Sequence, residues 1–154
     1  MTTPARMSAK KKLAAALVGA WICHRWSIRY ADGQVTRPFG LRPHGFILYT
    51  ADGFMSATIM AAGRKAFRAK NPRDASEAER AHAFAGYFSY AGRWRLSRGR
   101  IEHEVLAALN PGLVGTSQWR EVRLEGSRLT LAAVEKTATG LRRHEIEWRR
   151  PARR

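Results

Sequence analysis

Short segments in which apolar and polar residues alternate constrain the fold of this chain more than any other feature. The clearest covers residues 101–107, where two glutamates occupy one parity and the other parity holds Ile101, His103, Val105 and Ala107. A period of two is typical of a β-strand with one face in water and the other in the interior. Because the charged face must be the wet one, His103 is predicted to point inward.

The next alternating segment, residues 118–124, also places polar residues on the inner face. Glu121 and Arg123 mark its wet face, so Gln118 and Arg120 are expected to point inward with the apolar residues of the strand. Polar groups without partners are costly to bury. An inward histidine, glutamine and arginine therefore predict a lined cavity rather than a dry core.

The other strands are predicted from apolar or alternating runs between turn residues. They cover residues 19–30, 46–50, 54–60, 90–97, 115–125, 128–135 and 141–149. Ser76 and Glu79 form a capping-box pattern, which predicts a helix that runs to about Phe88 with an apolar stripe through Phe84, and residues 10–18 fit a short helix. Consecutive antiparallel strands in this number most simply close into a barrel, which has no exposed edge and can hold one small ligand. The predicted fold class is all-β, an antiparallel up-and-down barrel of about eight strands with one inserted helix.

Parity also predicts which side chains face the interior. In residues 54–60 the cleaner inner face holds Met55, Ala57 and Ile59. In residues 90–97 one face holds Tyr90, Gly92, Trp94 and Leu96. In residues 19–30 one parity holds Ile22, Trp26, Ile28 and Tyr30, with His24 among them.

The composition fits one folded domain with basic ends. The chain has 154 residues, ordinary apolar content and a net charge of +16, half of which lies in residues 1–12 and 149–154. The expected division is a basic disordered tail over 1–12, a barrel domain over 13–149 and a basic tail over 150–154. No apolar run reaches the roughly 18 residues that a membrane span needs.

The compartment is predicted from the start of the chain and from its cysteine. A secretory signal from Lys10 onward is weighed against a short helix that caps the fold. The helix is preferred, because the apolar part is short and continues into the first strand. The single cysteine, Cys23, excludes an internal disulfide, so the expected location is the cytoplasm.

Several sequence strings resemble a known family. Gly19-Ala20-Trp21 matches the lipocalin Gly-x-Trp signature, with Arg149 or Arg150 as the arginine that packs on the tryptophan. The longer strings are Leu17–Trp21, Pro38–Gly40, Gly45–Tyr49, Thr50–Ser56, Tyr87 with Tyr90–Arg93, His103 and Leu109–Gly115. Together they resemble the bacterial and fungal lipocalin-like domain family over residues 17–149. The resemblance implies a small antiparallel barrel around a ligand cavity, in a setting of secondary metabolism. By fold analogy, some barrels of this shape are cofactor-free cyclases or isomerases.

The candidate catalytic residues are His103, Arg120 and Tyr90. His103 would move a proton, since a free histidine has a pKa of about 6.5. Arg120 would clamp a carboxylate, phenolate or enolate, and a tyrosine hydroxyl would stabilise developing negative charge. The structural alternatives are a hydrogen-bonded core histidine, an ion pair and plain core packing. The candidate ligand-binding residues are Tyr49, Met55, Tyr87, Trp94, Gln118 and Trp26.

The functional prediction is a barrel that binds a small, largely apolar molecule, aromatic or polyketide-like, as a cyclase or isomerase or as a non-catalytic carrier or sensor. No metal site is expected, because the five histidines lack ligand spacing. No cofactor is expected, because the glycines form turns rather than a phosphate loop. A homodimer is left open. The alternative from another class is nucleic-acid binding through the basic tails and the basic residues of 64–73.

Overall fold

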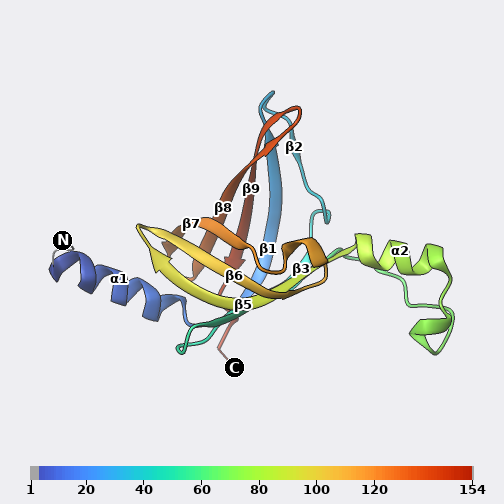
Figure 1. Cartoon of the computed structure of the whole chain (residues 1–154), viewed down its shortest axis with the longest axis horizontal. Coiled ribbons are helices and arrows are strands. Elements are labelled where there is room, and N and C mark those ends of the chain that lie inside the picture. The colour runs from blue at the N-terminus through green and yellow to red at the C-terminus, as the bar shows by residue number, and fades with distance from the viewer. Residues whose placement is uncertain (1–3, 154) are drawn as a thin grey trace.

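The computed structural model describes residues 4–153 of the chain as a strand-rich fold with two α-helices (Figure 1). The helices are α1 (Pro4–Leu17) and α2 (Glu77–Ala85). The strands are β1 (Gly19–Tyr30), β2 (Val35–Thr36), β3 (His44–Tyr49), β4 (Phe54–Met60), β5 (Tyr87–Ser97), β6 (Arg100–Ala108), β7 (Ser117–Glu125), β8 (Arg128–Thr137) and β9 (Gly140–Arg149). Short 3₁₀ turns η1 (Pro72–Asp74) and η2 (Pro111–Leu113) precede α2 and β7.

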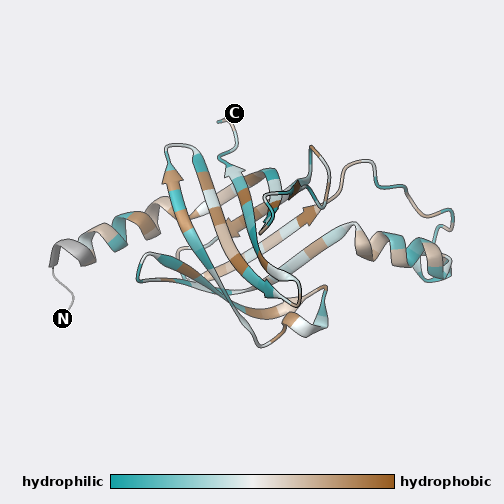
Figure 2. Cartoon of the chain, turned by 90° about the horizontal axis from the view of Figure 1, so that it is seen from above, coloured by the Kyte–Doolittle hydropathy of each residue, from teal (hydrophilic) through white to brown (hydrophobic). Residues whose placement is uncertain are grey.

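The strands form a closed antiparallel barrel, as predicted. The nine-stranded sheet has the order β2-β1-β3-β4-β5-β6-β7-β8-β9, and β1 also pairs with β9. This second pairing runs from Ile22 opposite Arg149 to Tyr30 opposite Arg142 and closes eight strands into the barrel, while β2 only extends β1. Apolar and polar residues alternate along the strands (Figure 2), which gives the barrel one wet and one packed face.

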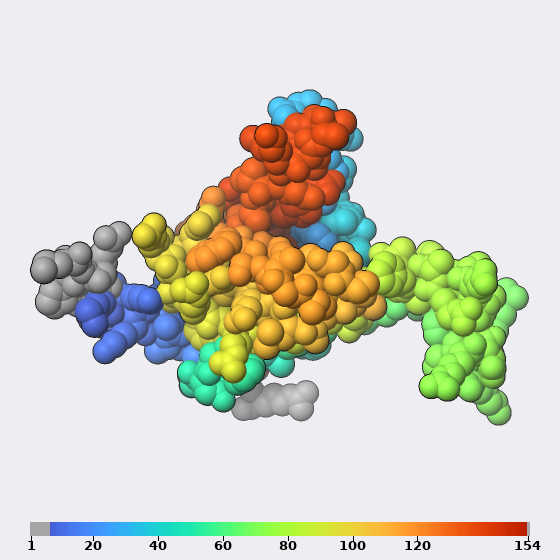
Figure 3. All heavy atoms as spheres, in the orientation of Figure 1, coloured from blue at the N-terminus to red at the C-terminus, as the bar shows by residue number. Residues whose placement is uncertain are grey.

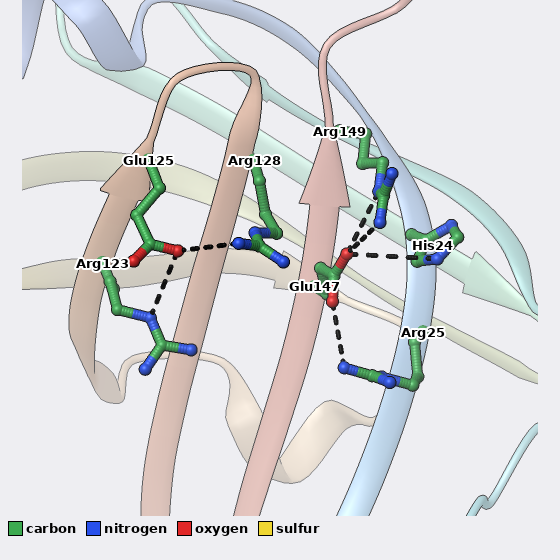
Figure 4. A network of polar contacts seen from close by, with 7 residues as sticks. All are labelled: His24, Arg25, Arg123, Glu125, Arg128, Glu147 and Arg149. Atoms are coloured by element: carbon green, nitrogen blue, oxygen red, sulfur yellow. Dashed lines mark hydrogen bonds and ion pairs between the residues drawn. The ribbon is translucent and has the colours of Figure 1, made fainter.

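A buried carboxylate holds the seam between β1 and β9. Glu147, on the outer face of β9, lies 3.0 Å from Arg25 and 2.8 Å from Arg149, and His24 approaches it at 4.0 Å (Figure 4). Burial opposes ionisation of Glu147, but the hydrogen bond from Arg149 and the neighbouring positive charges lower its pKa. The carboxylate therefore stays charged and joins side chains of both strands at the closure.

The end of the barrel beneath α1 is closed by Trp21 and Arg150. The Trp21 indole donates to the Leu17 carbonyl at 2.9 Å, and the Arg150 guanidinium lies 3.8 Å from the Trp21 ring centroid. Arg150 also donates to the carbonyls of Ala20 at 3.2 Å and Val18 at 2.9 Å. The arginine that packs on the signature tryptophan is therefore Arg150, and this side chain lies against the barrel although residue 150 was assigned to the tail.

The helices differ from the prediction in length and in what they cover. Helix α1 begins at Pro4, so the expected disordered segment is helical from that residue onward. The capping box of Ser76 and Glu79 is present, but α2 ends at Ala85 and has no buried residue. Phe84 is exposed, and Phe88 belongs to β5, because Gly86 ends the helix. The segment around α2 forms a lobe beside the barrel (Figure 3).

Two β-bulges change which side chains face the interior. The β1–β9 register shifts between Cys23 and Arg25, so Trp21 and Cys23 point inward before the shift and Trp26 after it. The single inner parity predicted for residues 19–30, with His24 inside, is therefore wrong. The β5–β6 register shifts opposite Leu106, which leaves the predicted inner residue Ala107 exposed.

Within the described part of the chain, no helix combines the length and the apolar character that a membrane crossing requires.

Candidate ligand cavity

The barrel encloses a cavity of about 380 Å³ with mostly apolar walls. Its apolar lining includes Trp26, Ile47, Ala57, Ile59, Phe88, Leu113, Leu131, Ile146 and Trp148. Its polar lining consists of Tyr90, His103, Asn110, Gln118, Arg120, Glu135 and His144. The exposed residues Val134 and Glu135 border the cavity far from Trp21, so the cavity opens at the end opposite the closure by Arg150.

His103 lies in this cavity wall between two tyrosine hydroxyls. Its Nε2 is 2.8 Å from the Tyr49 hydroxyl and its Nδ1 is 2.7 Å from the Tyr90 hydroxyl. The three residues come from β3, β6 and β5, and all are buried. Both ring nitrogens are therefore engaged, in a chain of three side chains that starts in the packed interior at Tyr49 and reaches the cavity at Tyr90.

Burial keeps this chain uncharged. Desolvation and the positive charge of Arg120 lower the pKa of His103 to about 3. Desolvation also raises the pKa of Tyr49 and of Tyr90, and Arg120 offsets part of both shifts. At neutral pH the chain thus consists of a neutral imidazole and two neutral phenols. This is far from the near-neutral pKa on which the proton-transfer role of His103 was predicted.

Arg120 and Gln118 lie on β7, next to the part of β6 that carries His103. Gln118 is paired with His103 and Arg120 with Ile101 in the β6–β7 register, so both side chains face the same wall. Arg120 donates to the Trp119 carbonyl at 2.9 Å and lies 3.5 Å from the Gln118 Oε1. Among the described residues, Arg120 forms no ion pair with a carboxylate, so its charge is available to the cavity.

A second polar group lies at the open end and was not predicted. The Trp26 indole donates to Nδ1 of His144 at 3.3 Å, and Nε2 of His144 is 2.9 Å from a carboxylate oxygen of Glu135. Hydrogen bonds from Arg142 and His144 hold the pKa of Glu135 at about 2 although burial opposes this. In the sequence, His144, Ile146 and Trp148 occupy alternate positions, and this alternation is the signal that indicates a shared face.

The structure brings five of the predicted site residues to the cavity wall. They are His103, Arg120, Tyr90, Gln118 and Trp26. Tyr49 lies directly behind His103. Phe88 and Trp148 were missed, the former because it was assigned to the helix.

Three other predicted ligand-binding residues are not on this wall. Met55 is buried in the core. The Trp94 ring packs 4.9 Å from the Tyr49 ring, and its indole donates to the Thr50 carbonyl at 3.0 Å. The guanidinium carbon of Arg64 lies 5.1 Å from the centroid of the Tyr87 ring.

Arginines on the outer surface stack on aromatic rings. Arg95 and Arg100 lie 5.8 and 5.1 Å from the Trp119 ring centroid, and Arg93 lies 4.9 Å from that of Phe54. Such pairs bring positive charge next to aromatic surface, the combination expected for nucleic-acid binding.

The closed antiparallel barrel with its interior cavity is a lipocalin-like architecture, which suggests small-molecule binding. The family model described as "Lipocalin-like domain" matches residues 18–151, and the chain therefore belongs to this family. No curated protein and no solved structure matches the chain.

Proposed function

We propose that the barrel binds one small, largely apolar molecule, aromatic or polyketide-like, in the cavity between Trp26 and the His103 wall. The observation that carries this proposal is the cavity of about 380 Å³, whose size and mixed lining are those of small-molecule sites. Apolar side chains supply most of the contact surface, and a few polar groups on one wall fix the orientation.

The proposal is tested by filling the cavity. Ala57, on the wall of the cavity, is buried on β4, whereas its neighbour Thr58 points outward. The probe is 2-methylnaphthalene, and its binding is measured by isothermal titration calorimetry. Ala57→Leu should weaken binding by at least about tenfold, since a larger side chain occupies the ligand's volume. Thr58→Leu is the matched control and should bind as the wild type does. Equal binding by both variants would place the probe elsewhere and contradict the proposal.

A cofactor-free cyclase or isomerase is the second candidate function. It is favoured by the convergence of Tyr90, Arg120 and Gln118 on one wall, because donors gathered at one point can stabilise developing negative charge. In this version Tyr90 and Arg120 contact the reacting oxygen, His103 positions Tyr90, and the aromatic walls hold the substrate in a reactive shape.

A carrier or sensor would bind the same molecule without changing it. The two versions are separated by mixing the protein with the biosynthetic precursor of the molecule that it retains. Conversion that slows in Tyr90→Phe and Arg120→Gln supports the enzyme. An unchanged precursor supports the carrier.

A further inference from the structure

The hydrogen-bond chain Tyr49–His103–Tyr90 can run in only two directions, because a neutral imidazole has one N–H donor and one acceptor nitrogen. In one direction Tyr49 donates to Nε2, and Nδ1–H donates to the Tyr90 oxygen. In the other direction Tyr90 donates to Nδ1, and Nε2–H donates to the Tyr49 oxygen. Each direction leaves one phenol proton unused, that of Tyr90 in the first case and that of Tyr49 in the second.

Surroundings of the two hydroxyls decide between these directions. Tyr49 is 2% exposed, does not border the cavity, and has His103 as its only hydrogen-bond partner among the described residues. An unused Tyr49 proton would therefore be a buried donor without an acceptor, which is costly. Tyr90 borders the cavity, where its free proton can meet a ligand or water.

The other polar groups of the cavity also offer hydrogen-bond donors that have no partner in the described part of the protein. Three of its acceptor oxygens already receive hydrogen bonds: Gln118 Oε1 from Arg120, Asn110 Oδ1 from the Gly112 amide, and Glu135 Oε2 from Arg142 and His144. Among the described residues, the buried indole N–H of Trp148 has no acceptor. Among the described residues, the guanidinium of Arg120 donates hydrogen bonds only to uncharged oxygens.

We propose that Tyr49, His103 and Tyr90 form a directed chain that presents the Tyr90 proton to the cavity, and that the ligand places an anionic oxygen, of carboxylate or enolate type, between Tyr90 and Arg120. This inference rests on the proposed function and specifies the polar end of its ligand. His103 is a positioning residue in this arrangement, since both of its ring nitrogens are hydrogen-bonded to tyrosines. Of the three residues in the chain, only Tyr90 contacts the ligand.

The direction of the chain is tested without any ligand. The protein is labelled with ¹⁵N-histidine, and the His103 signals are identified by their absence in His103→Asn. The wild type should show a protonated Nδ1 and an unprotonated Nε2 at neutral pH. Tyr49→Phe should keep the protonated Nδ1, because the reverse tautomer would leave the buried Nε2 proton without an acceptor. A protonated Nε2 in the wild type would overturn the proposed direction.

The ligand class is tested with two probes of one ring system, naphthalene-2-carboxylate and 2-methylnaphthalene. The carboxylate should bind at least about tenfold more tightly, as expected for hydrogen bonds to a charged group. Tyr90→Phe and Arg120→Gln should each reduce this preference. Arg123→Gln changes an exposed arginine of the same strand and should leave it intact.

The outcomes separate this inference from the proposed function. If both probes bind equally and compete for the cavity, small-molecule binding stands and the anionic head group is refuted. If Ala57→Leu leaves the binding of both probes unchanged, the cavity is not their site and both proposals fail.

Discussion

Burial of His103 between two phenols has a direct consequence for stability at mildly acidic pH. The pKa of His103 is about 3 in the folded protein, whereas a histidine in the unfolded chain has a pKa of about 6.5. Below pH 6.5 the unfolded chain therefore binds a proton that the folded protein does not. The stability contributed by a neutral His103 is complete above pH 6.5 and is lost as the pH falls from 6.5 toward 3.

The size of this effect follows from the two pKa values. One proton changes the free energy of unfolding by about 1.4 kcal/mol per pH unit in this range. Between pH 7 and pH 5, the loss attributable to His103 is about 2 kcal/mol. This is a large fraction of the stability of a typical domain.

The assay is urea unfolding at pH 7 and pH 5 for the wild type and for His103→Asn. The variant has a lower stability at both pH values, but it lacks the titrating group, so it should lose about 2 kcal/mol less than the wild type between them. Contributions of carboxylates common to both proteins cancel in this difference. His82→Asn, at an exposed position on α2, should keep the full wild-type loss. An equal loss in wild type and His103→Asn would refute the buried, neutral histidine.

Two further predictions concern the closed end and the strand packing. Arg150→Lys should lower the free energy of unfolding by about 2 kcal/mol, because lysine cannot both stack on Trp21 and reach the same carbonyls; a urea midpoint equal to that of the wild type would contradict this role. Gly45→Ala should cost about 3 kcal/mol in the same assay, since a Cβ would lie 2.0 Å from the Thr58 carbonyl oxygen. Wild-type stability of the alanine variant would show that β3 and β4 can separate without cost.

The barrel itself was predictable from the sequence, because alternation reports directly which face of a strand is buried. Met55, Ala57 and Ile59 are all buried on β4, as their parity predicts. The prediction for β1 failed because the bulge near His24 reverses the parity within one strand. A prediction from alternation assumes a constant period of two. The residue types around His24 do not show that a β-bulge adds one residue to the strand there.

The candidate site was predictable only in part, for a geometrical reason. Parity placed His103, Gln118 and Arg120 inside, and their strands β6 and β7 are neighbours. Tyr49 lies on β3, which is separated from β6 by two strands in the sheet, and it meets His103 only across the interior of the closed barrel. Strand order alone does not give such contacts, so the pairing of both histidine nitrogens with phenols, and the resulting low pKa, needed the structure.

Native mass spectrometry of the protein purified from its own host tests the central claim most directly. The protein should retain one small aromatic or polyketide-like molecule per chain, with an acidic oxygen, and Ala57→Leu should carry much less of it than Thr58→Leu. An empty barrel in both variants, with nucleic acid that survives a high-salt wash, would contradict the account and would assign the function to the basic outer surface.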